Sequence, residues 1–450
     1  MSVKSLVFAL CPSFLRPAFD RIENSPIGYR LARGVFWSMA GAVISRGLML
    51  AASVLVARVL GRTGYGELGM VNSTVGMFGV FAGFGLGLTA TKHVAEFRQS
   101  DPARAGRIIS LSSLFASVTG GLMALGLFIF APWLAEHTIN APHLAGVLRI
   151  GALILFINAL NGAQTGALAG FEAFRTIAYV NLFVGLISFP ILVSGAYLGG
   201  LTGAVWALAI NLGVNWLLNH VALRKEARRH GVPVTVRGCR REAPVLWRFS
   251  LPAAMSGSLV GPANWICSAL LVNRPEGYGE MGVYSAANQW FAMVIFLPSL
   301  LAQVVLPVLS ERLGQKEMRQ SIRTLTFAIK MNVLFVLPPV LLVSIVSQRV
   351  MNLYGEAFRS GWPTLIVVLL TAGLVAVQIP VGQIIAASGK MWIGFAMNGG
   401  WAFTFIIATL LLLDFGSLGL ATARAISYIV HSTWTFGFAY FIISRRNADG

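Results

Sequence analysis

Four basic side chains lie inside stretches of this sequence that are apolar enough to form membrane-spanning helices. An ionisable group is costly in lipid, and one that is retained there usually serves a function. No Asp or Glu lies in the middle of any such stretch, and apart from His431 the ionisable residues found there are basic. A pathway lined by cations suits an anionic passenger and suits a cationic drug poorly. The four residues are Arg46, Arg149, Lys330 and Arg424.

Arg46 is the sharpest candidate for binding an anion. It lies near the centre of a predicted span, about 18 Å from either edge, which is too far for the side chain to reach the interface easily. At 100° per residue it shares a helix face with small and polar residues, as in the wall of a cavity. The alternative is that Arg46 forms a structural ion pair with another helix, but the sequence has no intramembrane acid to serve as the partner. The other members of this face are Ser38, Ala42, Ser45, Met49 and Ser53.

Arg424 begins a second polar face, on the last predicted span. It lies about six residues from the span's outer edge, so both a binding role and an interfacial role stay open. His431, on the same face, could titrate near neutrality, but a hydrogen-bonded structural histidine is the favoured interpretation. The face follows the i, i+3, i+4, i+7, i+11 pattern of a helix and comprises Arg424, Ser427, Tyr428, His431 and Thr435.

Lys330 and Arg149 are weaker candidates because each lies near the end of its span, where a position at the membrane interface is the favoured interpretation. On the sixth predicted span, three asparagines stack at i, i+4 and i+8. They either line a pathway or bond to neighbouring helices, and the sequence leaves both interpretations open. These residues are Asn211, Asn215 and Asn219.

The elements that must position these residues are membrane helices. Of 450 residues, 56% are hydrophobic and only 11% are charged, against about 25% charged in soluble domains. The apolar runs have the length of spanning helices and not of barrel strands. We predict an all-α fold with twelve spans, at 34–57, 66–90, 108–131, 146–169, 177–199, 201–223, 248–273, 282–307, 325–347, 363–387, 392–413 and 418–442.

The basic residues indicate the orientation of these spans. Of the 34 Lys and Arg residues, 25 fall in one set of alternate gaps and five in the other. The positive-inside rule then predicts that both termini are cytoplasmic, and it explains the net charge of +18 better than nucleic-acid binding does. The most basic gap is a predicted cytoplasmic linker at 224–247. It either contacts anionic lipid headgroups or only determines the topology.

A repeat divides the spans into two bundles. The sequence Gly64-Tyr-Gly-Glu-Leu-Gly-Met-Val-Asn-Ser73 returns as Gly277-Tyr-Gly-Glu-Met-Gly-Val-Tyr-Ser-Ala286, each time between the first and second span of its half. Two homologous bundles indicate a transporter that opens to alternate sides. The predicted divisions are a cytoplasmic segment at 1–33, bundles at 34–223 and 248–442 joined by the linker, and a tail at 443–450. The three cysteines have no metal or disulfide spacing, and no cofactor is expected.

The first copy of this repeat belongs to a longer stretch that resembles a known family. With Leu60-Gly-Arg-Thr-Gly-Tyr-Gly66, Phe84-Gly-Leu-Gly87 and Ala95-Glu96, the chain is similar to the polysaccharide (O-antigen-type) flippases of the multidrug/oligosaccharidyl-lipid/polysaccharide exporter superfamily. The resemblance implies a V-shaped pair of bundles around a cationic cavity, onto which Arg46 and Arg424 map. It also implies movement of an undecaprenyl-pyrophosphate-linked oligosaccharide across the bacterial inner membrane. Membrane lipids and other polysaccharide-assembly membrane proteins are its implied partners.

Two alternatives belong to other functional classes. A drug antiporter of the same superfamily usually carries an intramembrane acid for cation coupling, and this sequence has none, which leaves the driving force open. A membrane polysaccharide polymerase or ligase is expected to need a large outer loop with catalytic groups. The longest predicted outer loops, 132–145 and 348–363, have about fifteen residues each, so we expect a transporter and not an enzyme.

Overall fold

The computed structural model describes residues 26–302, 305, 309, 318–388 and 391–448, and all regular elements in this part of the chain are helices. The first half contains α3 (Pro26–Gly83), α4 (Leu86–Phe97), α5 (Pro102–His137), η1 (Pro142–Leu144), α6 (Ala145–Gly170) and α7 (Phe174–Arg229). After the short helix η2 (Cys239–Glu242) come η3 (Leu246–Ser250), α8 (Leu251–Gly257), α9 (Val260–Val272) and α10 (Gly277–Val294). The last elements are α12 (Met318–Ile345), α13 (Ser347–Leu353), η4 (Glu356–Gly361), α14 (Trp362–Ala387), α15 (Met391–Leu412), η5 (Leu413–Phe415) and α16 (Gly416–Ala448).

Glycines divide the longest helices where the sequence predicts a turn between spans. The backbone of α3 leaves the helical region at Gly61 (φ 71°), which a residue with a side chain would adopt only under strain. In α7 the same happens at Gly199 and Gly200. Seven stretches of the described chain are long and apolar enough to cross a membrane, or eight if α10 and the helix after it, bent by 41°, form one span. The chain is therefore a multi-pass membrane protein, while the count of twelve spans stays a prediction.

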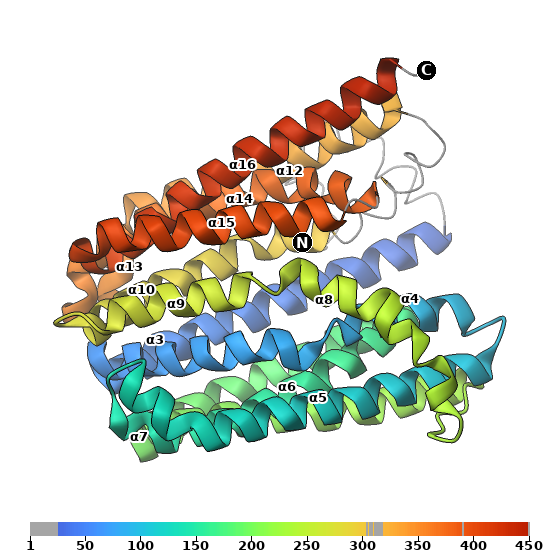
Figure 1. The fold of residues 1–450 in the computed structure, drawn as a ribbon, viewed down its shortest axis with the longest axis horizontal. Helices are drawn as coiled ribbons and strands as arrows, with labels where there is room; N and C mark the ends of the chain where they lie inside the picture. The colour runs from blue at the N-terminus through green and yellow to red at the C-terminus, as the bar shows by residue number, and fades with distance from the viewer. Residues whose placement is uncertain (1–25, 303–304, 306–308, 310–317, 389–390, 449–450) are drawn as a thin grey trace.

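The helices form two groups that follow the two halves of the sequence (Figure 1). We call the group from α3 to α7 the N lobe and the group from α8 to α16 the C lobe; η3, between them, packs against the N lobe through Leu246. In Figure 1 the lobes lie closest at the end where α13 is labelled and diverge toward the end where α3 begins and α16 ends. The largest cluster of buried apolar side chains draws on both lobes, including Tyr65 of the N lobe and Tyr284 of the C lobe.

The two copies of the repeat lie against each other where the lobes converge. A Cβ atom added to Gly66 would overlap the carbonyl oxygen of Tyr278, and one added to Gly282 would overlap that of Arg62. Both turns therefore lie at the same end of the molecule, as a parallel repeat requires and an inverted repeat does not allow. We call this contact between 62–69 and 277–285 the seam.

Polar contacts hold the lobes together around the seam. Arg62 forms an ion pair with Glu280, whose carboxylate also accepts a hydrogen bond from the backbone N–H of Ser417 at 2.7 Å. The hydroxyl of Tyr278 donates to the carbonyl oxygen of Ile139 at 2.8 Å.

The predicted linker begins as a helix and is fastened to the N lobe. Helix α7 continues to Arg229, six residues past the predicted edge of the sixth span. Farther along, the buried carboxylate of Glu242 accepts hydrogen bonds from Arg104 at 3.1 Å and from Arg107 at 3.0 and 3.1 Å, both at the start of α5. The basic residues of the linker are exposed, which suits either interpretation made from the sequence.

Candidate functional site

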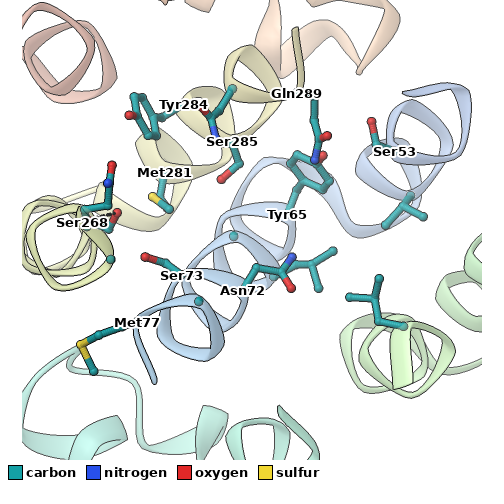
Figure 2. Close-up of a pocket in the computed structure, with 18 of the residues that line it drawn as sticks. Ser53, Tyr65, Asn72, Ser73, Met77, Ser268, Met281, Tyr284, Ser285 and Gln289 are labelled. Atoms are coloured by element: carbon teal, nitrogen blue, oxygen red, sulfur yellow. Dashed lines mark hydrogen bonds between the residues drawn. The ribbon is translucent and has the colours of Figure 1, made fainter. Parts of the chain in front are cut away.

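A cavity of about 750 Å³ lies between the two lobes, next to the seam. Figure 2 shows side chains of its lining, with Ser73 on α3 and Met281 on α10 pointing into the same space. The cavity has the size of a ligand site and is lined by apolar and polar residues together. The polar lining residues are Ser53, Tyr65, Asn72, Ser73, Asn264, Ser268, Tyr284, Ser285, Asn288, Gln289 and Arg424.

The repeat itself supplies two facing walls of this cavity. Asn72 and Ser285 occupy corresponding positions of the two copies, and both line the space. A side chain on Gly69 would overlap the hydroxyl of Ser285, so the walls meet closely at the seam end of the cavity. Two related sequences thus form one site, with hydroxyl and amide groups that can donate and accept hydrogen bonds.

Arg424 is the cationic group of this cavity and lies eight residues into α16. Its side chain is held by the C lobe: one terminal nitrogen donates to Asn288 Oδ1 at 2.7 Å and to the hydroxyl of Tyr284 at 3.2 Å. The guanidinium also lies over the ring of Phe291, 4.1 Å from its centroid. These contacts fix the position of the charge without neutralising it.

The electrostatics at Arg424 favour an anionic ligand. The residue is only 9% exposed, and its Nε–H, itself buried, has no hydrogen-bond partner. None of the described residues that line the cavity is an Asp or a Glu. A buried cation with an unused donor is costly unless an anion joins it, and phosphate oxygens match a guanidinium in two-pronged geometry.

The structure places Arg46 beside the cavity and not in its lining. Met49 and Ser53, one and two turns farther along the same face of α3, do line it. The Arg46 side chain is exposed, and its guanidinium lies 4.9 Å from the centroid of the Phe296 ring in the C lobe. Ser45 turns away and donates to the carbonyl oxygen of Asn181 in α7 at 3.2 Å. The side chain of Ser38 lies outside the described residues.

Two of the predicted cations lie outside the lining of this cavity. Lys330 of α12 and Arg149 of α6 are exposed, and Arg149 packs over the ring of Phe128 at 5.3 Å. Neither lines the cavity. Both positions suit the interfacial interpretation, because long side chains can extend along a helix toward headgroups.

His431 and Tyr428 line a second cavity, of about 460 Å³, within the C lobe. There Gln378 of α14 bonds to His431, to the hydroxyl of Thr435 at 3.3 Å and to that of Ser432 at 3.1 Å. His431 therefore takes part in a polar network between two helices, and the histidine side chain also faces open space.

One of the stacked asparagines of α7 bonds to a neighbouring helix. Asn219 donates to Asn215 in the same helix at 2.6 Å and to Asn161 of α6 at 3.5 Å, and Asn161 donates to the carbonyl oxygen of Leu212 in α7 at 3.2 Å. Sequence reasoning did not single out Asn288, Gln289 or Gln378, because a lone amide in an apolar helix has no distinctive spacing. Asn72 and Ser285 were inside the repeat, which was the available signal.

The described residues contain no cluster of His, Cys, Asp and Glu suited to a metal ion.

Comparisons with known proteins agree with one another. The family described as "Polysaccharide biosynthesis protein" matches residues 31–313. The EPS I polysaccharide export inner membrane protein EpsE of Ralstonia nicotianae is 25% identical over 397 residues, which cover 86% of this chain and 89% of that protein. The lipid III flippase of Escherichia coli is 24% identical over 93% of this chain and its own entire length.

Among solved structures, an inward-facing multidrug resistance MATE family transporter of the MOP superfamily superposes with a TM-score of 0.73. The match covers 90% of this chain and 96% of that one at 16% identity. At this level of identity the likeness concerns the fold, and it agrees with two helical lobes around a central cavity.

Proposed function

The chain belongs to the polysaccharide biosynthesis protein family, and from this premise we propose that it is a flippase that moves a lipid-linked oligosaccharide or polysaccharide precursor across the bacterial cytoplasmic membrane. The proposed passenger is an oligosaccharide linked to undecaprenyl pyrophosphate. The names of EpsE and of the lipid III flippase support the class of passenger. In this proposal the chain forms and breaks no covalent bond of its passenger.

The observation that carries the proposal is Arg424, a buried cation in the wall of a cavity between two related lobes. Moving a pyrophosphate through hydrocarbon unaided is prohibitive because its hydration would be lost without replacement. A guanidinium with an unused donor, next to the hydroxyl and amide groups of the cavity, can replace part of that hydration. A cationic drug would meet repulsion from Arg424 and no compensating acid.

The seam gives the proposed transport cycle its closed end. While the lobes are joined there, the cavity would receive the passenger from the diverging end. Opening the seam would separate Gly66 from Tyr278 and Gly282 from Arg62, and would break the ion pair of Arg62 with Glu280. Such a rocking motion of two lobes around a fixed site is the expected form of alternating access.

The orientation belongs to the proposal as well. With the basic gaps on the inside, both termini would be cytoplasmic and the seam would face the periplasm. We expect reporter fusions after residue 236 and at the C-terminus to report cytoplasm, and fusions after Ala141 to report periplasm. A periplasmic signal from residue 236 would reverse the map and place the seam on the cytoplasmic side.

A test in cells separates transport from synthesis of the passenger. Deleting the gene should remove surface polysaccharide while the lipid-linked precursor accumulates in the membrane, and a plasmid copy should restore both to the parental state. Lipid extraction and surface-glycan staining measure the two pools. Loss of the surface glycan without accumulation of the precursor would instead indicate a step in its synthesis and contradict the proposal.

A further inference from the structure

The second cavity, inside the C lobe, lies next to the charged site without being charged itself. Gly257 lines both cavities, and Tyr428 of the second lies one helical turn beyond Arg424 of the first. The polar face of α16 then continues along this cavity through His431 to Thr435. At a rise of 1.5 Å per residue, the stripe from Arg424 to Thr435 is about 16 Å long.

The lining of this C-lobe cavity is polar and neutral. None of the described residues that line it is an Asp, Glu, Lys or Arg. Amide side chains, a hydroxyl, a phenol and an imidazole supply both donors and acceptors, which is what sugar hydroxyls need. Apolar surface lies among them, suited to the C–H faces of sugar rings. The polar lining residues are Gln378, Gln383, Asn398, Tyr428, His431 and Thr435.

Resting on the proposed function, we infer that the C-lobe cavity binds the first sugar residues of the passenger, next to the pyrophosphate at Arg424, and that it selects uncharged sugars. The volume of about 460 Å³ falls within the range of small-ligand sites. An acidic sugar would bring a carboxylate into this space, where the described lining offers no Lys or Arg to pair with it, and this is unfavourable in a partly dehydrated site.

Two glycines allow this cavity to be filled from opposite helices. Gly382 of α14 and Gly394 of α15 both line it, and a Cβ on either would meet no heavy atom within 4 Å. Leucine at either position would therefore extend into the cavity. Gly373, also on α14, has the same open surroundings but does not line the cavity, so Gly373→Leu is a matched control.

The experiment measures binding of three probes to the purified full-length protein: undecaprenyl diphosphate, the same lipid bearing one neutral hexose, and the same lipid bearing one hexuronic acid. The parent should bind the hexose probe at least about tenfold more tightly than the bare lipid, as expected from one or two added hydrogen bonds. The hexuronic acid should give no such gain. Gly382→Leu and Gly394→Leu should remove the gain and keep the affinity for the bare lipid, and Gly373→Leu should keep both.

Each contrary result has a distinct meaning. A gain that survives in both cavity-filling variants, a parent without any gain, or an equal gain for the hexuronic acid would overturn the inference. Gln383→Ala, which shortens a lining side chain and adds no bulk, should reduce the gain several-fold, and it keeps the test readable if a leucine variant fails to reach the membrane. An undiminished affinity of Arg424→Ala for the bare lipid would contradict the proposed function and not this inference.

Discussion

Replacing Arg424 with alanine is expected to reduce export of surface polysaccharide by about 10²–10⁴-fold, if two charged hydrogen bonds to phosphate are lost at about 1.5–3 kcal/mol each. Arg424→Lys should retain part of the activity, because lysine keeps the charge but not the planar fork. The measurement is surface glycan relative to the amount of protein in the membrane. Arg149→Ala, which removes an exposed arginine away from the cavity, should export like the parent.

A subtler variant leaves Arg424 in place and neutralises it. Asn288 Oδ1 accepts a hydrogen bond from Arg424 at 2.7 Å, so Asn288→Asp would set a carboxylate against the guanidinium. This should impair export nearly as much as Arg424→Ala, whereas Asn288→Ala should be milder. Arg46→Ala should have an intermediate effect and Arg46→Glu a stronger one, since Arg46 lies beside the cavity. Normal export by both Arg424→Ala and Asn288→Asp would show that the cation has only a structural role.

Replacing Gly66 with leucine should block transport by preventing closure of the seam. Its side chain would overlap the carbonyl oxygen of Tyr278 in the opposite lobe, and overpacking of this kind costs about 1–3 kcal/mol. The lobes can avoid that cost by separating, so the protein should persist in the membrane with the seam open. Gly146→Leu is the control, because a Cβ there meets no heavy atom within 4 Å.

Labelling reports on the seam directly. A cysteine in place of Ser73, inside the cavity, should react slowly with a membrane-impermeant maleimide added from the periplasm and much faster in the Gly66→Leu variant. The native cysteines Cys11, Cys239 and Cys267 are first replaced. Equal labelling rates with normal export would mean that the seam does not gate the cavity.

The helices could be predicted from the sequence because lipid demands long apolar runs with few charges. Each predicted span has helical counterparts among the described residues, and the structure adds earlier starts and later ends, such as the start of α3 at Pro26. The repeat also indicated two related bundles. It could not predict the direct contact of its two copies, since an internal comparison gives correspondence and no distance.

The candidate site was harder to predict than the fold. The predicted depth in the membrane made Arg46 a stronger candidate than Arg424. Helical periodicity shows which residues share a helix face, but it does not show which neighbouring helix covers that face. The structure instead buries Arg424 against Tyr284 and Asn288 and leaves Arg46 exposed beside Phe296. Both neighbours of Arg424 lie about 140 residues away in sequence, so no local pattern contained them.

The most direct test of the central claim reconstitutes the purified protein in vesicles with an undecaprenyl-diphosphate oligosaccharide that carries a nitrobenzoxadiazole dye. Dithionite added outside quenches only the dye exposed in the outer leaflet. Vesicles with the parent protein should lose nearly all their fluorescence, whereas empty vesicles and vesicles with Arg424→Ala should keep the inner-leaflet share. If vesicles with the parent protein keep as much fluorescence after dithionite as empty vesicles do, the chain does not flip this class of lipid.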